Sequence, residues 1–88
     1  MERMTVQQWV DNGAEQEPTD NFSFFYLVKN GSVVLVDTYK PHGNNFAMSV
    51  VDNEGTFSNM IVPPNAVGIC MDNDIGTPTI EQFETLTK

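Results

Sequence analysis

The chemically richest stretch of this chain is Tyr39-Lys40-Pro41-His42-Gly43-Asn44-Asn45, which brings a phenol, an ammonium group, an imidazole and two amides together within seven residues. Glycine allows close approach to the backbone, and the surrounding donors suit an anionic or heteroaromatic ligand. The side chains that would contact such a ligand or a partner are those of Tyr39, Lys40, His42, Asn44 and Asn45. Proline, glycine and two asparagines predict that residues 40–45 form a loop and not a strand. The alternative to a binding site is a surface loop whose asparagines make their own turns.

Other arrangements that could support catalysis or hold a metal are weak. Cys70 is the only cysteine and His42 the only histidine, so a thiol nucleophile with a histidine base would depend on one unsupported pair. The acidic fragments at 52–54 and 72–74 lack the alternating ligands and distant glutamate of a calcium loop. We therefore predict a protein that is not an enzyme and holds no metal or cofactor. An enzyme would need His42 or a carboxylate with a shifted pKa in a pocket.

Composition limits the classes of partner. Twelve acidic residues against four basic ones give a net charge of -8, and binding to the nucleic-acid backbone needs clustered lysine and arginine. We expect no direct contact with nucleic acid. No apolar run approaches the roughly 18–20 residues of a membrane span, and residues 1–7 lack the apolar core of a signal peptide. The expectations are a cytoplasmic protein without a membrane segment and one compact domain over residues 1–88.

The element that must position this stretch is a β-hairpin over residues 22–39, closed by Asn30-Gly31. Asn-Gly favours a type I′ turn, whose two-residue loop fixes the register. The predicted pairs on one face are Val28–Val33, Tyr26–Leu35, Phe24–Asp37 and Phe22–Tyr39, and on the other Leu27–Val34 and Phe25–Val36. Both faces are apolar, whereas a small antiparallel sheet commonly has one wet face. One face is therefore expected to pack on the protein's own helices and the other on something else.

The remaining elements flank this hairpin. Thr5 as N-cap and Gly13 as the residue after the C-cap predict a helix over residues 5–12. A second hairpin runs from Phe46 to Val62, with either Val50 opposite Phe57 or Met48 opposite Met60. Residues 66–71 read as a further strand, and a capping box of Thr79 and Gln82 begins a terminal helix.

These elements predict an α+β fold with a mainly antiparallel sheet of four or five strands, made of two hairpins plus one strand. The short N-terminal and C-terminal helices would cover one sheet face together. A small β-barrel is the alternative.

Two functions follow from this arrangement. The first is a small acidic binding module, an inhibitor or accessory protein acting by protein–protein interaction or self-association through the first hairpin. Its anchors would be Phe25, Leu27, Val34 and Val36 on the exposed face, because interfaces gain affinity from central apolar anchors within a polar rim. The second is a homo-oligomer that binds or sequesters a small anionic, nucleotide-like molecule, with the stretch from Tyr39 to Asn45 as its site.

Overall fold

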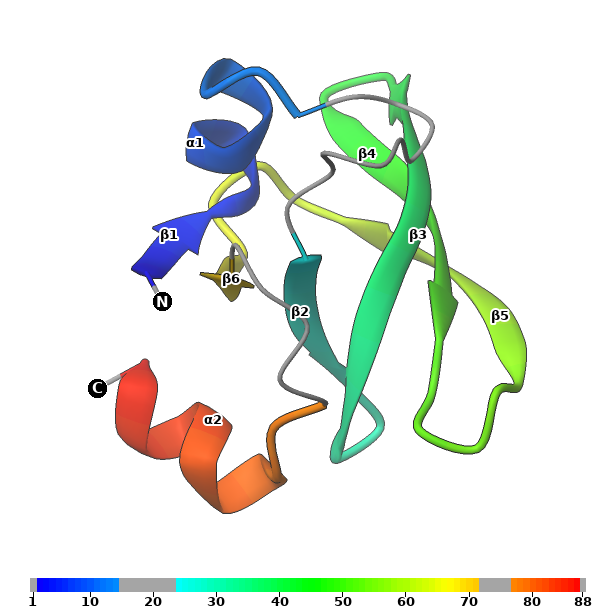
Figure 1. The fold of residues 1–88 in the computed structure, drawn as a ribbon. Helices are drawn as coiled ribbons and strands as arrows, with labels where there is room; N and C mark the ends of the chain where they lie inside the picture. Colours follow the sequence, from blue (N-terminus) through cyan, green and yellow to red (C-terminus); the bar gives the residue numbers. More distant parts are fainter. Residues whose placement is uncertain (1, 15–23, 72–76, 88) are drawn as a thin grey trace.

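The computed structural model describes residues 2–14, 24–71 and 77–87. Within them, six strands form one antiparallel sheet in the order β1-β6-β2-β3-β4-β5, accompanied by two short helices (Figure 1). The elements are β1 (Glu2–Thr5), α1 (Val6–Asp11), β2 (Phe24–Lys29), β3 (Ser32–His42), β4 (Asn45–Val51), β5 (Phe57–Val62), β6 (Val67–Met71) and α2 (Ile80–Leu86). The predicted α+β class and antiparallel sheet are confirmed, but the predicted strand number was too small.

The missed strand is β1, which the sequence pattern does not reveal. Its four residues, Glu-Arg-Met-Thr, do not alternate clearly between apolar and polar. They pair with β6, from Glu2 opposite Cys70 to Thr5 opposite Val67. The strand is held by this pairing and by Met4, which is buried in the core.

The first hairpin has the predicted turn and the predicted register next to it. Asn30 and Gly31 have φ of 52° and 81°, as a type I′ turn requires. The pairs Val28–Val33, Leu27–Val34 and Tyr26–Leu35 form. The paired register with β3 ends there, so it does not include the predicted pairs Phe25–Val36 and Phe24–Asp37. On its other edge β2 pairs with β6, where Phe24 lies opposite Met71 and Phe25 opposite Cys70. The predicted partner of Tyr39, Phe22, lies outside the described residues.

A β-bulge in β3 changes which face its later residues occupy. Val36 lies opposite Val50 of β4 and Thr38 opposite Ser49, which leaves Asp37 as the extra residue. Before the bulge Val34 and Val36 point into the core, and after it Tyr39 does. Simple alternation from Val36 would have sent Tyr39 to the opposite face.

The predicted loop at residues 40–45 is a second tight hairpin, so that prediction was wrong. β3 continues to His42, β4 begins at Asn45, and these two residues are paired. Gly43 has φ of 60° and Asn44 has no positive φ, which is the pattern of a type II′ turn with glycine at its first central position. The same glycine that suggested a ligand loop is therefore a hairpin signal.

The hairpin of β4 and β5 takes the second of the two predicted registers. Met48 lies opposite Met60 and Phe46 opposite Val62. Gly55 has φ of 85°, and the Oδ1 atom of Asp52 accepts hydrogen bonds of 2.9 Å from the backbone N–H groups of Glu54 and Thr56. The acidic fragment at 52–54 thus stabilises its own turn.

Both helices begin with a capping box, which was predicted for the second helix, whereas for the first only Thr5 as N-cap was predicted. The hydroxyl of Thr5 accepts from the backbone of Gln8, whose side chain accepts from the N–H of Thr5, and Thr79 and Gln82 repeat the arrangement. Gly13 follows α1 with φ of 93°. Helices of six and seven residues are too short to persist alone, so packing on the sheet must hold them.

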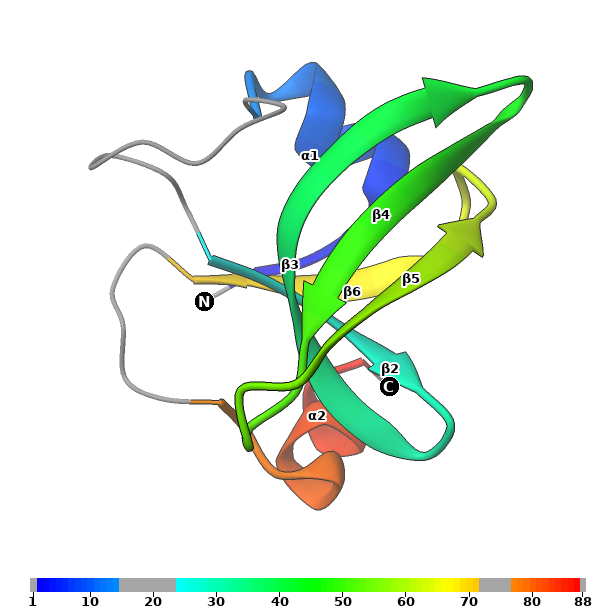
Figure 2. The same ribbon diagram turned by 90° about the vertical axis from the view of Figure 1, so that its right-hand side faces the viewer.

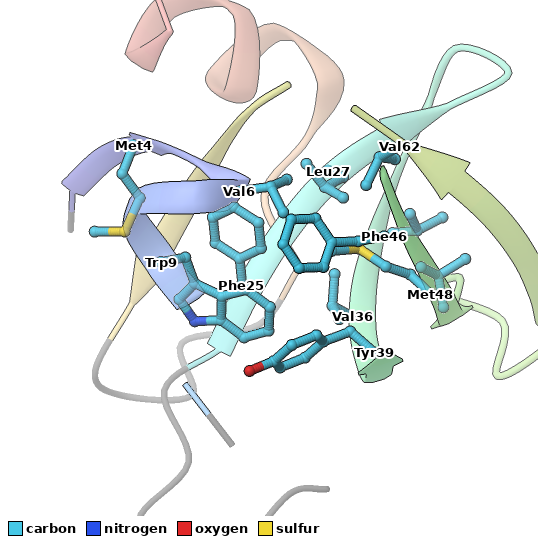
Figure 3. Packing of buried hydrophobic residues seen from close by; sticks show 12 residues of the cluster. Met4, Val6, Trp9, Phe25, Leu27, Val36, Tyr39, Phe46, Met48 and Val62 are labelled. Carbon is cyan, nitrogen blue, oxygen red and sulfur yellow. The ribbon is translucent and has the colours of Figure 1, made fainter. Parts of the chain in front are cut away.

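The two helices pack on opposite faces of the sheet, which corrects the prediction that they share one. Trp9 of α1 stacks on Phe25 of β2, with ring centroids 4.5 Å apart and planes 8° from parallel (Figure 3). Phe83 of α2 packs with Tyr26 and Ile69 on the other face. The first hairpin is apolar on both sides because each side meets a different helix.

The first hairpin is therefore not a free surface. Phe25, Leu27, Val34 and Val36 are all buried, with Phe25 0% exposed. Met4 and Val6 near β1 and Val62 of β5 belong to the same cluster. The sheet curls around this core so that its two outer strands contribute to it (Figure 2). The expectation that these four side chains offer anchors to a partner is wrong for the folded monomer.

Candidate functional site

The uncovered surface of the sheet lies over β3, β4 and β5. The buried cluster beneath α2 draws its sheet residues from β2, β3 and β6, because a seven-residue helix spans only part of the face. Beyond it lies an open groove of about 780 Å³. The lining residues come from three strands: Thr38, Tyr39, Lys40, His42, Ala47, Met48, Ser49, Asn59, Met60 and Ile61.

The hollow follows from side-chain size along the middle strand. Ala47 of β4 lies between Lys40 of β3 and Ile61 of β5 in the paired register. One row along, Ser49 lies between Thr38 and Asn59. Small residues in the centre and longer ones on each side leave a channel that follows β4.

The groove differs in charge from the rest of the chain. Its lining includes Lys40 and His42 and no carboxylate, although the chain carries a net charge of -8. Hydroxyl and amide groups of Thr38, Ser49 and Asn59 add hydrogen-bonding capacity. This surface suits a group that is partly apolar and carries a negative charge or several acceptors.

The wall formed by β5 is apolar and exposed. Phe57 is 60% exposed and Ile61 56%, and both face outward from an edge strand. Met60 and Val62, the alternate residues, pack toward the core. Large apolar side chains that are exposed and lie together beside polar groups mark an interaction surface.

Three of the five predicted ligand-contacting residues come together on this surface. Lys40 and His42 line the groove, and Asn45 is paired with His42 at the end of the same hairpin. Asn44 is exposed in the turn.

Tyr39 contributes to the lining of the groove, but its ring points into the core on the opposite face, so the expectation that this ring contacts a ligand is wrong. Its hydroxyl donates a hydrogen bond of 2.7 Å to the backbone oxygen of Ala14, and its ring lies 5.1 Å from that of Trp9 (Figure 3). Burial raises the pKa of the Tyr39 phenol above its ordinary 10.0. The bulge at Asp37 is what turned this side chain inward.

Sequence reasoning missed Phe57, Asn59 and Ile61. A signal existed in the register of the second hairpin. Once Met48 is set opposite Met60, residues 57, 59 and 61 must face away from the core. The register therefore places two large apolar residues, Phe57 and Ile61, on the exposed side of β5.

The other candidate groups of the sequence lie away from this surface or outside the described residues. No group of three or more His, Cys, Asp or Glu side chains within them could hold a metal, and residues 72–74 of the second acidic fragment lie outside them. Cys70 is half-buried on β6, with β2 between it and the strand of His42. No helix among the described residues is long and apolar enough to cross a membrane.

Comparison with protein-family models, with curated proteins and with solved structures yields no match for this chain.

Proposed function

We propose that this protein is a small, acidic, non-enzymatic binding module that acts by protein–protein interaction, as an inhibitor or accessory protein. The observation that carries the proposal is the uncovered face of β3, β4 and β5, where a groove without carboxylates adjoins two exposed apolar side chains. Exposed apolar anchors beside polar and charged groups are the usual make-up of an interface centre.

The groove also indicates the chemistry of the partner. Lys40 and His42 on one side suit a carboxylate or another acidic group, while Ala47 and Ile61 suit an apolar side chain. We infer a partner segment that places an acidic residue next to an apolar one. The groove takes the place of the first hairpin as the proposed interface, because the apolar residues of that hairpin are buried in the core.

The test compares three versions of the protein as bait in quantitative affinity capture from the source organism. Ile61→Glu changes the exposed wall of the groove, and Leu86→Glu is the matched control, since Leu86 is also an exposed apolar residue but lies on α2. We expect a partner that the wild type and Leu86→Glu retain and that Ile61→Glu loses. The purified partner should then bind Ile61→Glu at least tenfold more weakly in calorimetry. A partner held equally by all three versions would contradict this surface.

The donors of the groove favour one alternative, a small anionic and nucleotide-like ligand held by a homo-oligomer. Lys40 and His42 would neutralise the anion, with Thr38, Ser49 and Asn59 as hydrogen-bonding groups. Thermal-shift measurements with a nucleotide panel test it. A stabilising nucleotide whose effect disappears in the double variant Lys40→Ala with His42→Ala would favour this alternative over the protein partner.

A further inference from the structure

The free edge of β5 lies directly beside the groove. β5 ends the strand order, and β4 is the element with which it makes extensive contact among the described residues. In Figure 1 it lies at the right-hand margin of the molecule. An edge strand presents backbone groups that a further strand can pair with.

The register shows which residues carry those groups. The N–H of Asp52 donates to the carbonyl oxygen of Thr56 at 3.1 Å, so this pair is a hydrogen-bonded position of the β4–β5 ladder. Bonded and non-bonded pairs alternate in an antiparallel ladder. The pairs Val51–Phe57, Ser49–Asn59 and Ala47–Ile61 are therefore non-bonded, and the backbone groups of Phe57, Asn59 and Ile61 point away from β4.

A separate contact supports this assignment. The Nζ atom of Lys29, at the end of β2, donates to the backbone oxygen of Asn59 at 3.3 Å. That oxygen must point to the free edge to be reached from β2. The contact is exposed and long, so a backbone N–H with better geometry would replace it readily.

β5 itself carries none of the usual protection against pairing. Its sequence, Phe-Ser-Asn-Met-Ile-Val, contains no charged residue and no proline, although natural edge strands commonly rely on both. β5 is therefore a neutral edge on a chain whose net charge is -8. Two copies can meet along it without placing like charges opposite one another on the paired strands.

We propose that β5 pairs antiparallel with β5 of a second copy of this chain, about a two-fold axis at Asn59. In this register Phe57 of each copy lies opposite Ile61 of the other, and the two Asn59 residues face each other. All three outward-pointing residues fall at hydrogen-bonded positions. The two exposed apolar side chains, 60% and 56% exposed in the monomer, become cross-strand neighbours.

The second copy is the occupant that this strand fits, because the match is reciprocal. A two-fold interface requires that if one residue contacts another, the converse contact also forms. Centring on Asn59 satisfies this for both large apolar residues at once, whereas centring on Phe57 or Ile61 leaves the other without an apolar neighbour. The two-fold axis is perpendicular to the sheet, so the outer faces of the two copies lie on the same side of the joined sheet. Each groove then gains Phe57 of the second copy beside its own Ile61.

This inference deepens the proposed function by naming the assembly that completes the groove, and its test measures assembly rather than partner binding. Asn59→Cys is prepared in a Cys70→Ala background, since Cys70 is the only native cysteine. Paired residues at a hydrogen-bonded position are about 5.5 Å apart between Cα atoms, which a disulfide can bridge. We expect a disulfide-linked dimer under mild oxidation.

The matched control is Thr56→Cys in the same background. Residue 56 is also exposed and lies directly before β5, and it is not one of the two apolar anchors. In the proposed register its two copies are offset by six residues, about 20 Å along the strand. It should crosslink at least tenfold more slowly than Asn59→Cys. Equal rates, or faster crosslinking of Thr56→Cys, would overturn the register, and wild type that sediments as a monomer up to millimolar concentration would overturn self-pairing.

Lys29 gives an independent test, in which a substitution is expected to strengthen the dimer. Lys29→Met removes the donor that competes for the Asn59 oxygen and a cation close to the axis. The dimer dissociation constant, measured by sedimentation, should fall several-fold. Ile61→Lys should raise it at least tenfold, while Leu86→Lys on α2 leaves it unchanged. A dimer that Lys29→Met weakens and Ile61→Lys leaves intact would contradict pairing through this edge.

Discussion

Among single residues, Gly68 determines how closely β6 approaches β2. A Cβ atom built there would lie 2.5 Å from Cζ of Phe25 and 2.6 Å from the backbone oxygen of Tyr26. The ring of Phe25 occupies this space while Trp9 stacks on its other side. The absence of a side chain at position 68 is thus part of the packing of the first core.

Gly68→Ala should lower the free energy of unfolding by about 1–3 kcal/mol, because overpacking forces side chains or backbone to shift. Urea denaturation measures the loss. The control is Phe25→Leu combined with Gly68→Ala, in which the ring is gone. The double variant should lose less than the sum of the two single variants, and strict additivity would show that the ring and the new methyl do not meet.

Tyr39 should make stability depend on pH in the alkaline range. Burial raises the pKa of its phenol in the folded state above the ordinary 10.0 of the unfolded chain. The stabilisation is complete below pH 10 and is lost as the pH rises from there through the folded-state pKa. Urea denaturation at neutral pH and above pH 10 should therefore show a decline in stability.

Tyr39→Phe separates this effect from other alkaline transitions. It removes the hydrogen bond to the Ala14 oxygen and should reduce stability by about 1 kcal/mol at neutral pH. Above pH 10 its stability should decline less steeply than that of the wild type. An identical alkaline slope in both proteins would mean that Tyr39 ionises as readily folded as unfolded.

Among the elements, the bulge in β3 could not be predicted from the sequence, unlike most turns and both helix starts. Two turns are readable because Asn30-Gly31 and Gly55 place glycine or asparagine where positive φ is needed, whereas the turn at Gly43-Asn44 was predicted as a loop although Gly43 meets the same need. Helix starts are readable because Thr5 and Thr79 each precede a Gln by three residues. The bulge has no comparable signature: Asp37 lies in an otherwise regular run, and the pairing of β3 with β4 alone reveals it.

Deleting Asp37 should therefore be far more harmful than changing it. Without the extra residue, either Tyr39 turns outward or the residues before the bulge do, and one part of the first core is lost. We expect the deletion to reduce stability by at least about 3 kcal/mol, comparable with truncating a large core residue. Asp37→Ala keeps the residue count and should stay within about 0.5 kcal/mol of wild type. Chemical denaturation compares the two, and equal losses would contradict the argument.

At the scale of the whole molecule, the two apolar faces of the first hairpin are confirmed, but the prediction that one of them packs on something other than the protein's own helices is wrong. The alternation showed two apolar faces, yet no local pattern states which helix covers which face. Trp9 and Phe83 pack on opposite faces of the sheet, so the first hairpin lies at the centre of the fold. The uncovered surface therefore lies over β4 and β5 and not on the hairpin. Lys40 and His42 could be found from the sequence because they are close in the chain, whereas Phe57 and Ile61 reach the same surface only through the register of β5.

The net charge of -8 makes one prediction that separates the two kinds of contact proposed for this surface. Two copies of an acidic chain repel at long range, while β5 contributes no charge to their contact. Salt screens this repulsion, with a Debye length of about 10 Å at 0.1 M. Sedimentation at low and high sodium chloride should therefore show the dimer strengthening with salt.

A partner segment whose acidic residue contacts Lys40 and His42 should respond in the opposite way, because salt weakens attraction between exposed opposite charges. Lys40→Gln is the control that connects the two measurements. It should remove much of the salt dependence of partner binding and leave that of the dimer almost unchanged, since Lys40 lies across β4 from the paired edge. A dimer that salt weakens would mean that charges outside β5 hold the copies together.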